Sequence, residues 1–175
     1  MDVLHDLAPT CDLYASLPVA DAFDWAMSGT ALGTGEWYLV AFRSVRKPEA
    51  DEAKLALYDE FAHQEAAKAP GFVHYYKGPT CSDGTCLSFC LWASRADARS
   101  AAGRPAHIEA VGLLGEMYAT YTLEFLRVRR EHDRAPLEFE PYDAVPPAAA
   151  TPDAAALGAD PSGRLPDFQT NPLAS

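Results

Sequence analysis

The chain has 175 residues, of which 49% are hydrophobic and 19 are aromatic (3 Trp, 8 Tyr and 8 Phe), enough for a substantial core. The formal net charge is −11, from 14 basic and 25 acidic residues, and no stripe of Lys and Arg is present. Nucleic acid is thereby excluded as a partner and an anionic membrane surface is disfavoured, because both attract basic patches.

The sequence has no evident targeting or membrane-spanning segment. Met1–Asp6 has neither a basic region nor a continuous apolar one, and no run approaches the ~18 apolar residues of a membrane span. We therefore expect a cytoplasmic protein.

Residues 1–35 are the least regular part and are expected to form an N-terminal extension. Apolar residues at helical spacing predict a short helix over Asp21–Met27, which three glycines then end. Two interpretations stay open. The extension packs on the domain, or it forms a flap over a pocket with Trp25 as its anchor.

A strong strand is predicted over Glu36–Ser44, which is nearly continuous in β-branched and aromatic residues. A helix follows from about Glu49 to Lys68 and ends at Pro70-Gly71. Apolar residues at helical spacing should form its buried face, with charged residues pointing outward. The apolar set is Ala53, Leu57, Tyr58, Phe61 and Ala62, and the outward set is Asp51, Glu52, Asp59 and Lys68.

Two further strands are predicted at Phe72–Lys77 and Cys86–Trp92. The turn formers between them include Asp83-Gly84, a strong hairpin signal, so the two strands should be antiparallel. In the second strand, small or polar residues alternate with Leu87, Phe89 and Leu91, which gives it two different faces.

A second helix begins at Ser94, where Ser94-Arg-Ala-Asp97 matches a capping box. Gly103-Arg104-Pro105 interrupts it, because a proline inside a helix removes a hydrogen bond. The helix resumes at Ala106 and runs to about Ala119, before a fourth strand at Tyr121–Arg129.

The order β-α-β-β-α-β predicts an α+β, ferredoxin-like fold with a four-stranded antiparallel sheet and both helices on one face. This domain should span residues 36–131, followed by a C-terminal arm and a Pro/Ala-rich tail over 132–175. The other sheet face needs cover, since it would otherwise leave a large apolar patch. A second copy of the chain is the commonest solution, so we expect a homodimer; the extensions could supply part of the cover instead.

Residues 37–129 resemble the dimeric α+β barrel superfamily, and within it the antibiotic-biosynthesis-monooxygenase-like domains. The supporting residues are the Trp37–Phe42 block, Pro70-Gly71-Phe72 before a strand, Trp92 at a strand end, and His107 in the following helix. The chain also resembles an uncharacterised family of this fold. Such folds include cofactor-free oxygenases acting on polyketide-like phenols, haem-degrading enzymes, cyclases, isomerases and non-catalytic members, so the resemblance implies a fold and no single reaction.

Two histidines are candidates for acid–base chemistry. Alternation places His74 and Tyr76 on one strand face, with Tyr75 and Val73 on the other. If the His74 face meets the helices, imidazole could act as a base and the Tyr76 phenol as a donor to an oxyanion. The structural alternative is a histidine that forms a hydrogen bond in the core or at a dimer interface.

His107 follows the helix-breaking proline, close to a helix N-terminus and to Arg104. A helix N-terminus and a guanidinium both favour an anion, such as a substrate carboxylate or phenolate. The helix end should also lower the pKa of His107 and favour a neutral base. The alternative is a surface histidine beside a surface arginine.

We expect no cofactor, with haem as an alternative. The haem-degrading branch pairs a His in the second helix with a preceding Trp and an Asn on the first strand. Here Val111 is near that His position, and neither the Trp nor the Asn is present. His107 could ligate iron only in another register.

Three cysteines, Cys81, Cys86 and Cys90, do not match a zinc pattern. Cys86 and Cys90 are roughly 13 Å apart on a strand at about 3.3 Å per residue, too far to share a metal. We expect no metal site and small, reduced core cysteines. A charged Glu124 in mid-strand would need a partner such as Arg43 or Arg127.

These observations predict a homodimer that binds a small aromatic or polyketide-like molecule between the second helix and the sheet. If it is an enzyme, it should be a cofactor-independent monooxygenase, cyclase or isomerase. The catalytic candidates are His107, His74 and Tyr76, and the substrate-binding candidates are Arg104, Trp37, Trp92 and Tyr118. The rival hypothesis is a non-catalytic ligand-binding or stress-related dimer.

Overall fold

The computed structural model describes residues 4–143, with residues 27–29 described in their backbone only. Its five-stranded antiparallel sheet has the strand order β2-β3-β1-β4-β5. The strands are β1 (Gly35–Arg46), β2 (Phe72–Tyr76), β3 (Thr85–Trp92), β4 (Tyr118–Arg130) and β5 (Glu138–Pro141). The first four follow the predicted β-α-β-β-α-β order, which confirms the α+β, ferredoxin-like fold, and β5 adds an edge strand beside β4.

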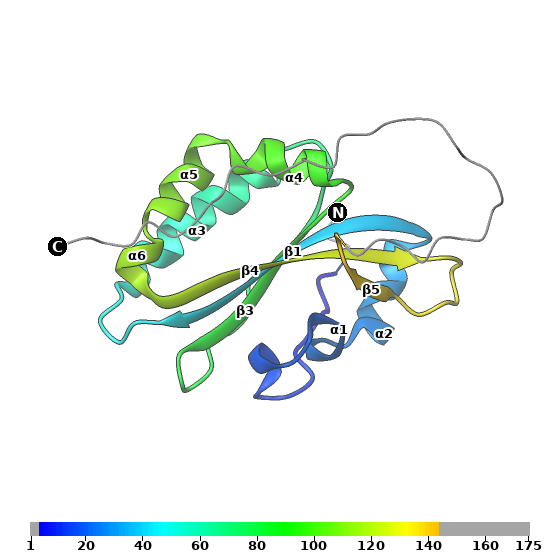
Figure 1. The fold of residues 1–175 in the computed structure, drawn as a ribbon, viewed down its shortest axis with the longest axis horizontal. Coiled ribbons are helices and arrows are strands. Elements are labelled where there is room, and N and C mark those ends of the chain that lie inside the picture. Colours follow the sequence, from blue (N-terminus) through cyan, green and yellow to red (C-terminus); the bar gives the residue numbers. More distant parts are fainter. Residues whose placement is uncertain (1–3, 144–175) are drawn as a thin grey trace, which may run out of the picture. The chain divides into compact units, whose positions relative to one another are not determined.

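The helices lie on both sides of the sheet (Figure 1). One side carries α3 (Glu52–Ala66), α4 (Arg95–Ala102), α5 (Pro105–Gly112) and α6 (Leu114–Met117). The other side carries the short N-terminal helices α1 (Val19–Ala22) and α2 (Trp25–Ser28). Two 3₁₀ turns, at Tyr14–Ser16 and Gly29–Leu32, flank them in the chain.

The helix starts follow local hydrogen bonding. The Asp51 side chain accepts from the Lys54 amide to cap α3, and the Ser94 side chain accepts from the Asp97 amide to cap α4, as its capping box predicts. Pro105 is the first residue of α5, where its missing amide proton costs nothing. The second helix is therefore split into three, and it ends at Met117, two residues before the predicted end.

The register assigns the strand residues to two faces. Leu39 and Ala41 of β1 pair with Leu91 and Phe89 of β3, and these residues belong to a core shared with the N-terminal segment. The alternate residues Tyr38 and Trp92 pair on the helix side, where they belong to a second core with Ala98 and Ala101 of α4. The predicted alternation in β3 is therefore confirmed, and its Leu87, Phe89 and Leu91 face away from the helices.

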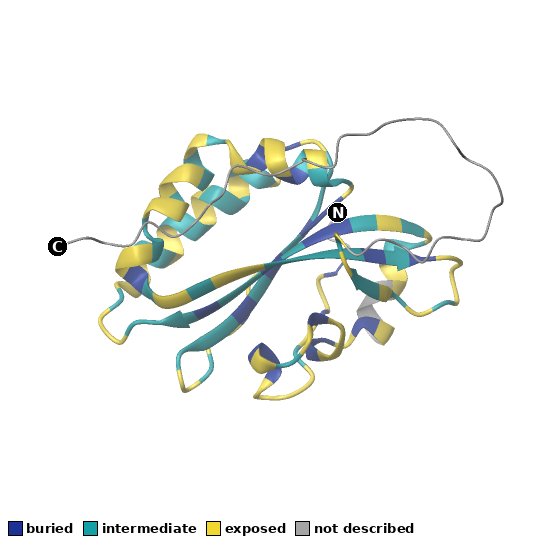
Figure 2. Ribbon diagram, viewed as in Figure 1, coloured by how far each residue is buried: buried dark blue, intermediate teal, exposed yellow. Residues whose placement is uncertain are grey.

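The orientation predicted for α3 is wrong. Leu57 and Phe61 are 50% and 47% exposed, whereas Asp59 is partly buried and bonds to groups on the strand side. The outer surfaces of α3 and α5 are largely exposed in Figure 2. The helix has apolar residues on more than one face, and in the observed orientation Asp59 pairs with Lys77 on the strand side.

A bulge in β2 also changes which residues share a face. The register shifts between Phe72 and His74, so that Phe72 pairs with Trp92 and His74 with Leu91. Tyr75 therefore shares the helix side with Phe72, and Val73 packs with the opposite core instead of sharing a face with Tyr75.

The second sheet face is covered by the N-terminal segment, which is the interpretation in which the extension packs on the domain. Trp25 is 7% exposed in that core. No helix in residues 4–143 has the combination of length and apolar character needed to cross a membrane. The predicted tail beyond residue 144 lies outside the described residues.

Candidate functional site

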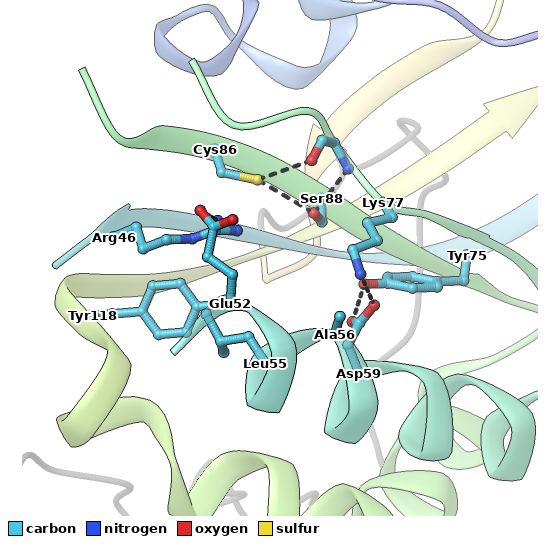
Figure 3. Close-up of a pocket in the computed structure, with 11 residues that line it drawn as sticks. Arg46, Glu52, Leu55, Ala56, Asp59, Tyr75, Lys77, Cys86, Ser88 and Tyr118 are labelled. Carbon is cyan, nitrogen blue, oxygen red and sulfur yellow. Dashed lines mark hydrogen bonds and ion pairs between the residues drawn. The ribbon is translucent and has the colours of Figure 1, made fainter. Parts of the chain in front are cut away.

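A cavity of about 250 Å³ lies between α3 and the helix-facing side of the sheet. Glu52, Leu55, Ala56 and Asp59 of α3 form one wall. The opposite wall comes from β1, β2, β3, the start of β4 and the residues that follow β2 (Figure 3). The cavity thus lies against α3, the first helix of the domain, and not between the second helix and the sheet, where the sequence predicts the ligand.

Asp59 of α3 bonds to Tyr75 of β2 and to Lys77, the residue that follows β2, at one wall of the cavity. The Tyr75 hydroxyl donates a hydrogen bond to Asp59 Oδ1 across 2.5 Å, and Lys77 Nζ lies 2.7 Å from Asp59 Oδ2. Both oxygens of the carboxylate are thus engaged, one by a phenol and one by an ammonium group (Figure 3). Charge-assisted hydrogen bonds of this kind are the stronger ones in proteins, so this group holds α3 against β2.

A second ion pair borders the cavity. Arg46 Nη1 of β1 lies 3.0 Å from Glu52 Oε1 of α3, and the ring of Tyr118 lies beside them in Figure 3. Arg46 Nε is buried and has no hydrogen-bond partner among the described residues. The two ion pairs give the walls two positive and two negative charges, so their formal charge is zero.

The third part of the wall is a small polar group on the hairpin of β2 and β3. The Ser88 hydroxyl accepts from the Gly78 amide across 3.0 Å, and Cys86 Sγ donates to the Gly78 carbonyl across 3.3 Å. Cys86 and Ser88 are two residues apart in β3, so their side chains lie on the same side of the strand and both reach the cavity.

Burial controls the protonation of the cavity groups. It raises the pKa of Tyr75, and the negative charge of Asp59 raises it further. Burial also raises the pKa of Tyr118 and of the Cys86 thiol. At neutral pH these three groups are therefore neutral hydrogen-bond donors and neither phenolates nor thiolates.

Among the residues predicted from sequence, Tyr118 lines the cavity. His74 and Tyr76 lie on the opposite sheet face, because they pair with Leu91 and Phe89 of the other core. His74 is 4% exposed and its ring lies 5.9 Å from that of Phe89. The structure therefore does not bring His74 and Tyr76 together with His107.

His107 and Arg104 lie at the start of α5, as predicted, but away from the cavity. The anion at this helix N-terminus belongs to the chain itself, since Glu65 Oε2 of α3 accepts from the Ala106 amide across 3.0 Å. The pKa of His107 is lowered as expected; burial is the cause, and the charge of Glu65 opposes it.

The two predicted tryptophans are also separated. Trp92 is 4% exposed in the helix-side core, where its ring meets Phe72 edge-on at 5.4 Å. Trp37 packs against the core on the opposite face. Neither side chain lines the cavity, and each packs in or against a core instead.

Sequence reasoning did not single out Asp59, Tyr75 and Lys77. The available signal was the alternation in β2, which places Tyr75 on the other face from His74. A charged residue on the sheet-facing side of a helix is the complementary signal, and it could be recognised only once the helix orientation was known.

The cavity does not suit haem. Among the described residues no histidine lines it, and His107 lies in α5, away from the cavity. In residues 4–143, no three or more His, Cys, Asp and Glu side chains gather as a metal site. Glu124 pairs with Arg43, as its mid-strand position predicts, and contributes to the opposite face.

Solved structures resemble this chain over about half its length. SnoaB, a cofactor-independent oxygenase from Streptomyces nogalater, is 18% identical with a TM-score of 0.41, covering 50% of this chain and 89% of its own. Rv0793 from Mycobacterium tuberculosis is 19% identical with a TM-score of 0.44, covering 55% and 95%. An antibiotic biosynthesis monooxygenase is 21% identical with a TM-score of 0.44, covering 50% and 94%.

These proteins are of the kind that the sequence resemblance indicates, and the likeness concerns the fold alone. No curated protein matches the chain. A family model described as PB2B2.08-like matches residues 1–141, the N-terminal segment included. The chain belongs to this PB2B2.08-like family.

Proposed function

We propose that the protein binds a small organic molecule, with one ring and a hydroxyl or carbonyl group, in the cavity between α3 and the sheet. The observation that carries this proposal is the Asp59 carboxylate, held at the wall between the Tyr75 hydroxyl and the Lys77 ammonium group. A pocket with a few convergent polar groups is the usual form of a small-molecule site.

The size of the cavity supports a small ligand. Its volume of about 250 Å³ lies just below the roughly 300–1,000 Å³ typical of ligand pockets. A single phenol-sized ring suits this volume better than a fused polyketide. The balanced charges of Arg46, Glu52, Asp59 and Lys77 favour a ligand that is neutral when it enters.

The chemistry that these groups support is proton transfer. The Asp59 carboxylate accepts a proton from the carbon next to a carbonyl, and the electron pair left on the substrate forms an enolate. Lys77 neutralises the enolate oxygen. Formation of the enolate is the step shared by three reactions: isomerisation, in which Asp59 returns the proton to another carbon; cyclisation, in which the enolate carbon attacks a second carbonyl and the resulting alkoxide takes the proton; and cofactor-independent oxygenation, which also consumes dioxygen as the oxidant.

A second candidate function is ligand binding without turnover. One observation favours it: both oxygens of Asp59 are already engaged, by Tyr75 and by Lys77. To accept a proton from a substrate, the carboxylate would have to share an oxygen that already bonds to one of these two groups.

Two measurements test the proposal on the full chain. Binding of 4-nitrophenol is measured by titration calorimetry, for wild type, Asp59→Asn and the control Glu60→Gln. Glu60 is adjacent in sequence but bonds to Gln64 on the exposed side of α3. Asp59→Asn should weaken binding about tenfold, the effect of losing a charged hydrogen-bond partner, and Glu60→Gln should not. Equal binding by all three, or none, contradicts the proposal.

Exchange of the α-protons of phenylacetone in D₂O, followed by NMR, separates catalysis from binding. Exchange that depends on Asp59 supports the proton-transfer function. Binding of the ketone without accelerated exchange supports the non-catalytic alternative.

A further inference from the structure

The sheet face opposite α3–α6 is apolar and is covered by the chain's own residues 4–25, which include α1. The strand residues Leu39, Leu87, Phe89 and Leu91 on this face have no measurable exposure. A bare face of this kind would be an association surface, which is why the sequence alone favours a second copy as its cover.

The segment packs on the sheet through aromatic rings. The Phe23 ring lies 5.3 Å from that of Phe89 and 4.8 Å from that of Tyr76, both edge-on. The Trp25 ring lies 5.4 Å from that of Phe89 and 5.0 Å from that of Phe139 in β5. The segment therefore contacts the middle of the sheet and reaches its added edge strand.

Polar groups fasten the same segment to the sheet. Arg43 of β1 donates to the carbonyls of Ala15 and Leu17, each across 2.6 Å. The Tyr14 hydroxyl donates to the Pro79 carbonyl across 2.6 Å, in the loop between β2 and β3. These three bonds satisfy polar groups that a partly buried contact would otherwise leave unpaired, so the contact is specific as well as apolar.

The segment also holds itself together. The Thr10 amide donates to the Ala22 carbonyl and the Asp24 amide donates to the Ala8 carbonyl, each across 3.0 Å. Pro9 and Phe23 form an isolated bridge between the same two stretches. The segment thus presents Phe23 and Trp25 to the sheet from a closed loop.

We propose that residues 4–25 replace a second subunit on this sheet, so that the chain does not pair with another copy through its sheet face. A copy pairing there would have to displace the aromatic contacts of Phe23 and Trp25 and break the bonds of Arg43 and Tyr14. This inference concerns the opposite side of the sheet from the cavity and does not depend on the proposed function.

Hydrogen exchange and sedimentation of the full chain test the proposal together. The amides of Thr10, Leu17, Ala22 and Asp24 should be protected, whether the chain sediments as a monomer or as a dimer joined elsewhere. A dimer in which these amides exchange as in an unfolded chain would overturn the proposal. A monomer with unprotected amides would overturn it as well, because the segment would not cover the sheet.

A matched pair of arginine variants sharpens the test. Arg43→Gln removes the two bonds to the segment together with the pair to Glu124, whereas Arg129→Gln removes an exposed pair with Glu138 on β5. Arg43→Gln should speed exchange of the four amides by about tenfold and produce a concentration-dependent dimer, and Arg129→Gln should do neither. Should Arg43→Gln fail to fold, Tyr14→Phe removes the single bond to Pro79 and should loosen the segment in the same direction. Unchanged exchange in a folded variant contradicts the proposal.

Discussion

The hydroxyl of Tyr75 donates a hydrogen bond to Asp59 across 2.5 Å and so joins β2 to α3 at the wall of the cavity. The hydrogen bond requires both residues, and each comes from a different element. The strand positions the phenol, the helix positions the carboxylate, and Lys77 balances its charge. The contact thus joins the sheet-facing side of α3 to β2 at the wall of the cavity.

The first prediction concerns this bond. Tyr75→Phe should lower the free energy of unfolding by about 1.5–3 kcal/mol, since it removes a hydrogen bond to a charged, partly buried group. The control is Tyr58→Phe on α3, whose hydroxyl has no hydrogen bond to another described residue and should change stability little. Urea denaturation of both variants measures the difference. Equal losses would show that the Tyr75 hydroxyl contributes no more than that of Tyr58.

The cysteines should differ sharply in reactivity. Burial raises the pKa of the Cys90 thiol to about 12, with a further contribution from the negative charge of Asp59, and burial also raises the pKa of Cys86. Cys11 is exposed. At pH 8.5 iodoacetamide should therefore modify Cys11 first and leave Cys90 almost unmodified, because the thiolate is the reacting form. Peptide mapping by mass spectrometry measures each rate, and comparable rates at Cys11 and Cys90 would contradict the prediction.

His107 should make stability depend on pH in a defined direction. Burial lowers its pKa in the folded chain below the ordinary value of 6.5, so the unfolded chain binds a proton more readily. Above pH 6.5 the histidine is neutral in both the folded and the unfolded chain, so it does not affect stability. As the pH falls below 6.5, the unfolded chain binds a proton first, and the folded chain loses stability relative to it. The wild type should therefore lose stability relative to His107→Gln between pH 7.5 and pH 5. Denaturation curves of both proteins at several pH values test this, and a constant difference would refute it.

Two glycines should respond oppositely to substitution by alanine. Gly71 has φ +73°, and a Cβ there would lie 2.3 Å from Asp97 Oδ2 at the start of α4. Gly71→Ala should therefore cost more than about 1 kcal/mol through backbone strain and overlap. Gly112, at the end of α5, has no neighbour within 4 Å of such a Cβ, so Gly112→Ala should be neutral or stabilising by up to about 1 kcal/mol. Thermal denaturation distinguishes the two, and similar shifts in Tm would contradict the prediction.

Much of the fold was predictable because it depends on local patterns. Alternation in β3, the turn at Asp83-Gly84 and the capping box at Ser94 all appear in the structure, with Thr85 bonding back to Asp83 and Ser94 bonding to Asp97. These signals involve neighbours in the chain, so the strand and helix order follows from them. The apolar sheet face likewise implied that something must cover it.

What only the tertiary structure decided was which faces meet. A period of two separates the sides of a strand but does not say which side meets the helices. From the sequence, His74 and Tyr76 are therefore the candidates, whereas Tyr75 of the other side lines the cavity. Apolar residues on more than one side of α3 left its rotation undetermined from sequence, and the structure turns Asp59 towards Tyr75 and Lys77. The N-terminal segment reaches the sheet through contacts distant in sequence, such as Tyr14 with Pro79. The sequence by itself determined where the helices and strands lie. Packing between residues distant in sequence decided where the cavity lies and what covers the sheet, because burial depends on the whole chain.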